Sequence, residues 1–207
     1  GANIAVFLWE LMLGPDLRAA YYGWGLVPER ITAALTGQTS LPAAAITFVS
    51  SMFMHGGWLH LLGNMWYLWI FGDNIEDRLG HVGFLLFYLA AGIASAALHV
   101  AVHPWSSVPT VGASGAIAGV LGAYAALFPR TRIVTLVPIF FFFQVIALPA
   151  LVVLGLWFVL QFFSGALSLG LPGGGVAWWA HIGGFLFGVL GIRLMTRGGP
   201  SRAWVQD

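Results

Sequence analysis

Four polar side chains stand in apolar parts of this sequence, where they have the types and spacing needed for hydrolysis. Ser114 and His181 each open an apolar run, and His60 and Asn64 lie four residues apart in a third. A serine paired with a histidine makes a nucleophile with its general base, and two donors on one helix face can stabilise an oxyanion. Polar groups are costly at membrane depth, so each needs a reason to be there. The pattern predicts a serine hydrolase built inside a bilayer.

Ser114 lies between glycines in the segment Gly-Ala-Ser-Gly-Ala at residues 112–116, where a loop meets a predicted helix. A helix N-terminus presents unpaired backbone N–H groups and the positive end of the helix dipole, which favours a developing oxyanion. The motif alone is weak in a chain with 28 glycines. A plain helix cap or a small packing residue is therefore the alternative interpretation of Ser114.

His181 strengthens the catalytic interpretation because small residues follow it at helical spacing. Stripes of small residues let two membrane helices approach closely. We therefore expect the helices that begin near Ser114 and His181 to pack together and to bring the two side chains within reach. The stripe below His181 is Gly184, Gly188 and Gly191, and the matching stripe below Ser114 is Ala118, Gly122 and Ala126.

No acidic residue is placed to orient His181 from within the membrane. A Ser–His dyad is thus favoured over a triad, with packing or backbone contacts orienting the imidazole. Glu76 and Arg78 are expected to cap and anchor the end of the helix that carries His60, together with Asp77. A metal site of His55, His60 and His181 is disfavoured, because no carboxylate lies near them in sequence. We expect His55 to hold loop structure. We expect the protein to use no cofactor.

The composition describes a helical membrane protein. Hydrophobic residues make up 59% of the 207 positions, charged residues only 7%, and the mean hydropathy is +0.90. The expected fold class is all-α, as one domain over residues 1–207. With no cysteine, disulfides and thiolate metal sites are excluded, and a net charge of +1 gives no sign of a nucleic-acid partner.

Apolar runs of about 20 residues, the length that crosses a bilayer, predict six transmembrane helices. The first, within residues 2–13, is short, and we expect it to have lost its beginning. A long loop with some amphipathic helix follows at 14–42. The stretch 133–169 is too long for one span, and Pro138 and Pro149 divide it into an interfacial segment and one helix. The other predicted spans are 58–75, 81–102, 114–128, 148–167 and 176–195.

Arginine placement orients these spans, since basic residues concentrate in cytoplasmic loops. With the N-terminus inside, Arg18 and Arg30 lie outside. On this topology Ser114 and His181 share the outer side of the membrane. The arginines expected inside are Arg78, Arg130, Arg132, Arg193, Arg197 and Arg202.

Taken in order, these motifs resemble the rhomboid family of intramembrane serine proteases, in its bacterial type, over nearly the whole chain. The matching segments are HGGWLHLLGN at 55–64, NIEDRLG at 74–80, GASG at 112–115 and AHIGGFLFG at 180–188. The resemblance implies a six-helix core that cleaves transmembrane proteins, with Ser114 as nucleophile and His181 as base. His60, Asn64 and the Ser114 N–H would form the oxyanion hole, and Gly112 would bind substrate. Structural roles would fall to His55, Glu76, Arg78, Gly115, Gly184 and Gly188.

One departure from the family pattern concerns the support of His181. Some members carry an aromatic residue four positions after the serine, whereas this chain has Ala118, so another side chain must support the imidazole.

The expected substrates are single-span membrane proteins with helices that unwind readily. They would enter between helices, with the predicted fifth helix and the loop 170–175 as candidate moving parts.

The expected location is a bacterial inner membrane, with the site opening to the outer side. This expectation rests on two features: all the basic residues are arginines, and the six-helix core is compact. Two alternative functions remain open. The protein could be a catalytically silent relative that binds membrane helices without cutting them. It could also be a channel or transporter, which would need a polar cavity as well. Loss of cleavage in serine variants separates the first from a protease, and flux in proteoliposomes separates the second.

Overall fold

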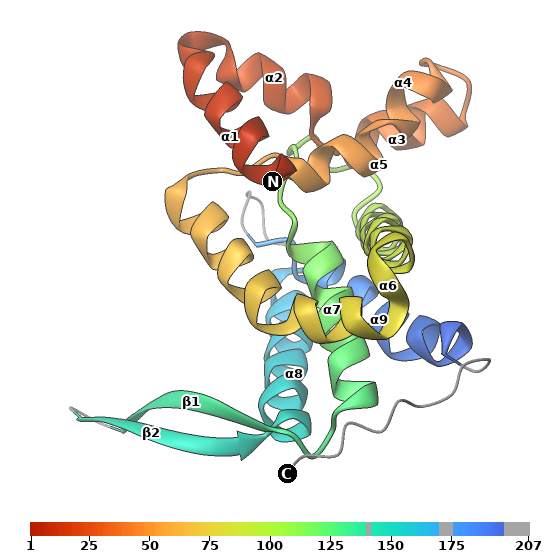
Figure 1. The fold of residues 1–207 in the computed structure, drawn as a ribbon. Helices are drawn as coiled ribbons and strands as arrows, with labels where there is room; N and C mark the ends of the chain where they lie inside the picture. The colour runs from red at the N-terminus through yellow and green to blue at the C-terminus, as the bar shows by residue number, and fades with distance from the viewer. Residues whose placement is uncertain (140–141, 170–175, 197–207) are drawn as a thin grey trace.

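The computed structural model describes residues 1–139, 142–169 and 176–196, and most of them are helical (Figure 1). The loop 170–175 and the residues Arg197 and Arg202 lie outside this part of the chain. The helices and the two strands are α1 (Ala2–Met12), α2 (Leu17–Trp24), α3 (Pro28–Leu35), α4 (Leu41–Ala45), α5 (Thr47–Ser50), α6 (Trp58–Val102), α7 (Ser114–Leu127), β1 (Arg132–Ile139), β2 (Phe142–Pro149), α8 (Ala150–Ser168) and α9 (Trp178–Met195). Short 3₁₀ turns occupy Gly14–Asp16 and Ser51–Phe53.

Three of the described helices, α6, α8 and α9, are long and apolar enough to cross a membrane. Helix α6 has 45 residues and bends at Gly80, whose φ of 71° lies in the left-handed region that glycine adopts readily. Each arm of α6 is about 33 Å long, which matches the hydrocarbon thickness of a bilayer. The two arms correspond to the predicted spans 58–75 and 81–102. Helices α1 and α7 are apolar but shorter.

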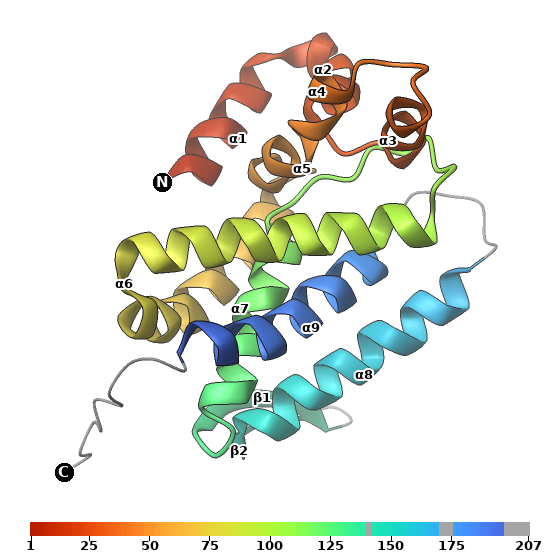
Figure 2. The same cartoon turned by 90° about the vertical axis from the view of Figure 1, so that its right-hand side faces the viewer.

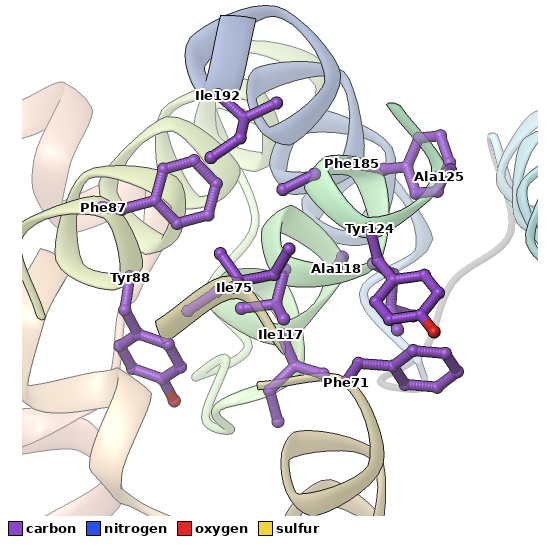
Figure 3. Packing of buried hydrophobic residues seen from close by; sticks show 14 of the residues in the cluster. Phe71, Ile75, Phe87, Tyr88, Ile117, Ala118, Tyr124, Ala125, Phe185 and Ile192 are labelled. Carbon is purple, nitrogen blue, oxygen red and sulfur yellow. The ribbon is translucent and has the colours of Figure 1, made fainter. Parts of the chain in front are cut away.

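Helix α7 is the buried centre of the molecule. It begins at Ser114 and ends at Leu127, one residue before the predicted end, and nearly all its side chains are covered. Helices α6 and α9 pack along it, and α8 lies against α9 (Figure 2). Large side chains from α6 and α9 close the core around the small residues of α7 (Figure 3). This cluster includes Phe71, Ile75, Phe87, Tyr88, Ile117, Tyr124, Phe185 and Ile192.

Backbones of α7 and α9 come into direct contact at Gly184 and Gly188 of the predicted stripe, but the nearest partners on α7 are Gly115 and Gly119, which the stripe predicted there did not include. A methyl group added at Gly184 would overlap the carbonyl oxygen of Gly115, and one at Gly188 would overlap that of Gly119. No larger side chain fits at these crossings without separating the helices. The glycines below His181 therefore hold the start of α9 next to the start of α7.

The prediction of an all-α fold is wrong at one place. Residues 132–149 contain an antiparallel hairpin, in which Arg132 pairs with Pro149 and Val137 with Gln144, instead of a merely interfacial segment. Isoleucine, valine, threonine and phenylalanine dominate this stretch, and such residues favour strands. Pro138 also disfavours a helix here. Figure 1 shows the hairpin projecting from the end of the bundle opposite α1–α5. Helix α8 follows at once, close to the predicted span 148–167.

Candidate active site

Ser114 and His181 lie within hydrogen-bond distance, although 67 positions separate them in the sequence. Ser114 is the first residue of α7 and His181 stands in the first turn of α9, so the glycine contacts between these helices align the two side chains. The distance from Ser114 Oγ to His181 Nε2 is 2.9 Å. The imidazole is buried, whereas the serine is half-buried. A buried imidazole next to a reachable hydroxyl can accept the hydroxyl proton.

The other side of the His181 ring is held by α8. His181 Nδ1 lies 2.7 Å from Gln161 Oε1, and the Trp157 ring lies near the imidazole with centroids 5.9 Å apart and a 31° tilt. Trp157 thus gives the imidazole an aromatic support that Ala118 cannot supply. Orientation by packing or backbone contacts was expected from the sequence, and the Gln161 side chain was not. The signal available was a lone amide in a helix that is otherwise almost wholly apolar.

His60 presents a hydrogen-bond donor to the space beside Ser114. The Gly56 N–H donates to His60 Nδ1 over 3.2 Å, so the neutral ring carries its proton on Nε2. A Cβ added at Gly112 would lie 2.7 Å from that Nε2, and Gly112 has a φ of +133°. The residue two positions before Ser114 must therefore be glycine, both for its backbone conformation and for the approach of His60.

Asn64 presents a second donor. Its side chain is buried, and within the described residues Nδ2 has no hydrogen-bond partner. A buried donor without a partner is unfavourable and marks a group that can bind something else. Asn64 lines a cavity of about 250 Å³ together with His60, Ser114 and His181. One α6 face therefore directs two donors at the space beside the serine.

A larger cavity of about 1310 Å³ also borders Ser114. It lies between the second arm of α6, the loop 103–113 and the start of α9, and His60 and His181 contribute to its wall. Backbone hydrogen bonds tie the loop to the N-terminal region, through Leu26 with Thr110 and through Gly112 N–H to Ser51 O over 2.9 Å. The region of α1–α5, which gathers at this end of the bundle (Figures 1 and 2), thus helps to place Gly112, two positions before the serine.

His55 is fully buried beside His60, and its backbone is held from two sides. Both carboxylate oxygens of Glu10 accept its N–H, at 3.1 and 3.2 Å, and the Tyr21 hydroxyl donates to its carbonyl at 3.0 Å. Burial, with the neighbouring His60 as a smaller cause, lowers the pKa of His55 to about 4. A loop role was expected for His55 from the sequence, but its contact with Glu10 was not. A lone acid in the first apolar run was the available signal.

Of the remaining predicted structural residues, Gly115 adjoins Ser114, whereas Glu76 and Arg78 lie away from the site. Glu76 and Arg78 stand at the end of the first arm of α6, and Glu76 Oε1 lies 2.6 Å from His81 Nδ1 across the bend at Gly80. Gly115 packs against the Ser95 side chain. Among residues 1–139, 142–169 and 176–196, no group of three or more His, Asp or Glu side chains is placed to hold a metal ion.

These features define a class of protein: a helical bundle with membrane-length helices that holds a hydrogen-bonded serine and histidine between α7 and α9, next to two donors from α6. Comparison with known proteins agrees with this class. A family model described as the rhomboid domain matches residues 42–198. The chain belongs to the rhomboid family, as the resemblance in sequence predicted.

Several curated relatives support this assignment. The chain is 30% identical to Rhomboid protein 1, mitochondrial, of Saccharomyces cerevisiae, over 92% of this chain and 50% of that protein. It is 34% identical to Presenilin-associated rhomboid-like protein A, mitochondrial, of Danio rerio, over 73% of this chain and 38% of that protein. A human protein, Presenilin-associated rhomboid-like protein, mitochondrial, is 32% identical over 73% and 39%. The chain spans half the length of these relatives or less.

The expected location in a bacterial inner membrane is contradicted by these relatives, whose names place them in mitochondria. A bilayer of any origin demands apolar helices of about the same length, and neither an arginine-only basic set nor a compact helical core distinguishes one membrane from another.

Proposed function

We propose that this protein is an intramembrane serine endopeptidase that uses Ser114 and His181 as a catalytic dyad. The observation that carries the proposal is the 2.9 Å contact between Ser114 Oγ and His181 Nε2. His181 Nε2 takes the hydroxyl proton while Oγ attacks the carbonyl carbon of the scissile peptide bond. The imidazolium then gives this proton to the leaving amine. Water entering the larger cavity hydrolyses the acyl-enzyme by the same steps in reverse.

The oxyanion hole consists of His60 Nε2–H, Asn64 Nδ2–H and the backbone N–H of Ser114. The first two are donors directed at the space beside the serine, and the third stands at the N-terminus of α7. Donors preorganised around a developing oxyanion act strongly where water is excluded, and loss of one typically lowers kcat by about 10²–10³. The arrangement fits acyl transfer better than a metal-assisted or redox reaction.

The proposed substrates are single-span membrane proteins. A substrate strand would lie along the loop that ends in Gly112, next to the larger cavity, because this loop leads directly to the nucleophile. A substrate helix must unwind before attack, which favours residues with low helix propensity near the bond to be cut. In this proposal six spans cross the bilayer: α1, the two arms of α6, α7, α8 and α9.

Cleavage of a fluorogenic transmembrane peptide by the purified protein tests this function. Ser114→Ala and His181→Ala should each abolish cleavage and labelling by a fluorophosphonate probe. The matched controls are Ser40→Ala and His81→Ala, which change exposed residues away from the site and should keep wild-type rates. Cleavage that survives Ser114→Ala would refute the nucleophile. A folded wild type that cuts no peptide and takes up no probe would favour the silent, helix-binding function.

A further inference from the structure

Gln161 is the one strongly polar amide in α8, and its burial contrasts with the rest of that helix. Its side chain is 8% exposed, whereas the flanking Leu160 and Phe162 are largely exposed. A buried amide in an apolar helix is costly unless it is hydrogen-bonded. The partner of its oxygen is His181 Nδ1, at 2.7 Å. The packing of α8 therefore brings this amide to the back of the candidate general base.

The direction of this hydrogen bond decides which tautomer His181 adopts. An amide oxygen only accepts, so Nδ1 must carry the ring proton in the neutral imidazole. The lone pair then lies on Nε2, which faces Ser114 Oγ at 2.9 Å. That is the arrangement a general base needs, because Nε2 can accept the serine proton. The opposite tautomer would present an N–H to the serine and could not accept its proton.

We propose that Gln161 is a positioning residue that fixes the tautomer and the ring orientation of His181, with Trp157 packed on the ring. This inference rests on the proposed protease function. Trp157 and Gln161 are four residues apart, so they project from the same face of α8. The dyad is thus competent only when α8 is docked against α9. Three helices, α7, α8 and α9, therefore supply the geometry of the dyad.

A neutral amide suits this place because it leaves no unpaired charge in an apolar interior when His181 is neutral. A carboxylate in its place would stabilise the imidazolium more strongly, but it would also bury a charge beside a neutral ring. The amide has a corresponding cost: it stabilises the transient imidazolium less. A carboxylate at this position should therefore change the pH dependence of the rate, whereas a residue with only a structural role would not affect it.

The test compares three variants in the fluorogenic cleavage assay. Gln161→Met keeps the size of the side chain and removes the acceptor, and kcat should fall about 10-fold or more with KM nearly unchanged. Gln161→Glu restores an acceptor oxygen and should recover most of the rate, with the acidic limb of the pH–rate profile moved to higher pH. Leu160→Met introduces the same side chain at an exposed neighbour and should behave as wild type.

A second readout does not depend on turnover. The ¹⁵N spectrum of histidine-labelled protein, assigned with His181→Ala, should show His181 protonated on Nδ1 in the wild type and a population protonated on Nε2 in Gln161→Met. If Gln161→Met does not fold, the Gln161→Glu profile and the wild-type spectrum decide the question.

The inference is overturned if Gln161→Met folds and keeps wild-type kcat, if Gln161→Glu is as inactive as Gln161→Met, or if wild-type His181 carries its proton on Nε2. Each of these results leaves the dyad intact as long as Ser114→Ala and His181→Ala are inactive. Failure of the proposed function looks different, because the wild type itself would then neither cut the peptide nor react with the probe.

Discussion

Replacing Gly112 by alanine should inactivate the protein by displacing His60. The new Cβ would lie 2.7 Å from His60 Nε2 and 2.8 Å from Cε1, where ordinary contact begins at about 3.4 Å. The imidazole must therefore retreat by about 0.7 Å, which moves its N–H away from the proposed oxyanion. Loss of one such donor lowers kcat by about 10²–10³. The φ of +133° adds backbone strain of about 1–3 kcal/mol to the folded state.

Two controls separate the steric effect from the strain. Gly37→Ala places alanine at another positive φ, +77°, where a Cβ meets no atom within 4 Å, so it should lose stability but keep its rate. In a His60→Ala background the clash is absent, so Gly112→Ala should then reduce kcat far less than it does in the wild type. Thermal unfolding in detergent and the peptide cleavage assay measure the two quantities.

A folded Gly112→Ala variant that keeps kcat within a factor of about three would refute the displacement of His60, since a displaced donor should cost far more. The same conclusion follows if the effects of Gly112→Ala and His60→Ala on kcat simply multiply. Independent effects would mean that Gly112 acts without His60, for example through substrate contacts alone.

Close glycine contacts and buried polar groups should also affect the stability of the fold. Gly188→Ala should lower stability by about 1–3 kcal/mol in thermal unfolding, because its methyl group overlaps the Gly119 carbonyl, whereas Gly155→Ala fills open space and should be nearly neutral. Glu10→Leu should cost about 1–3 kcal/mol by leaving the His55 N–H unpaired, and Glu10→Gln, which keeps one acceptor, should cost less; equal losses would argue against the hydrogen bond. With a pKa of about 4 when folded and 6.5 when unfolded, His55 takes up its proton first in the unfolded state. Stability should thus fall as pH drops from 6.5 towards 4, and His55→Gln should flatten that fall.

The parts of this protein that follow from local pattern could be predicted well. The start of α7 at Ser114, the two arms of α6 and the start of α8 after Pro149 are set by apolar periodicity, prolines and small residues, which act over a few turns. The glycines below His181 indicated the contact with α7 for the same reason. The hairpin at 132–149 was missed because apolar β-branched runs are ambiguous between strand and interfacial segment.

The sequence by itself determined which residues can do chemistry and which helices carry them, since residue type and helical spacing are local properties. Only the tertiary structure decided what holds them in place. Gln161 reaches His181 only because α8 docks with one particular face turned towards α9, and Glu10 reaches His55 across 45 positions of sequence. Such contacts depend on the rotation and depth of whole helices. Packing over the entire bundle sets those quantities, and no short pattern records them.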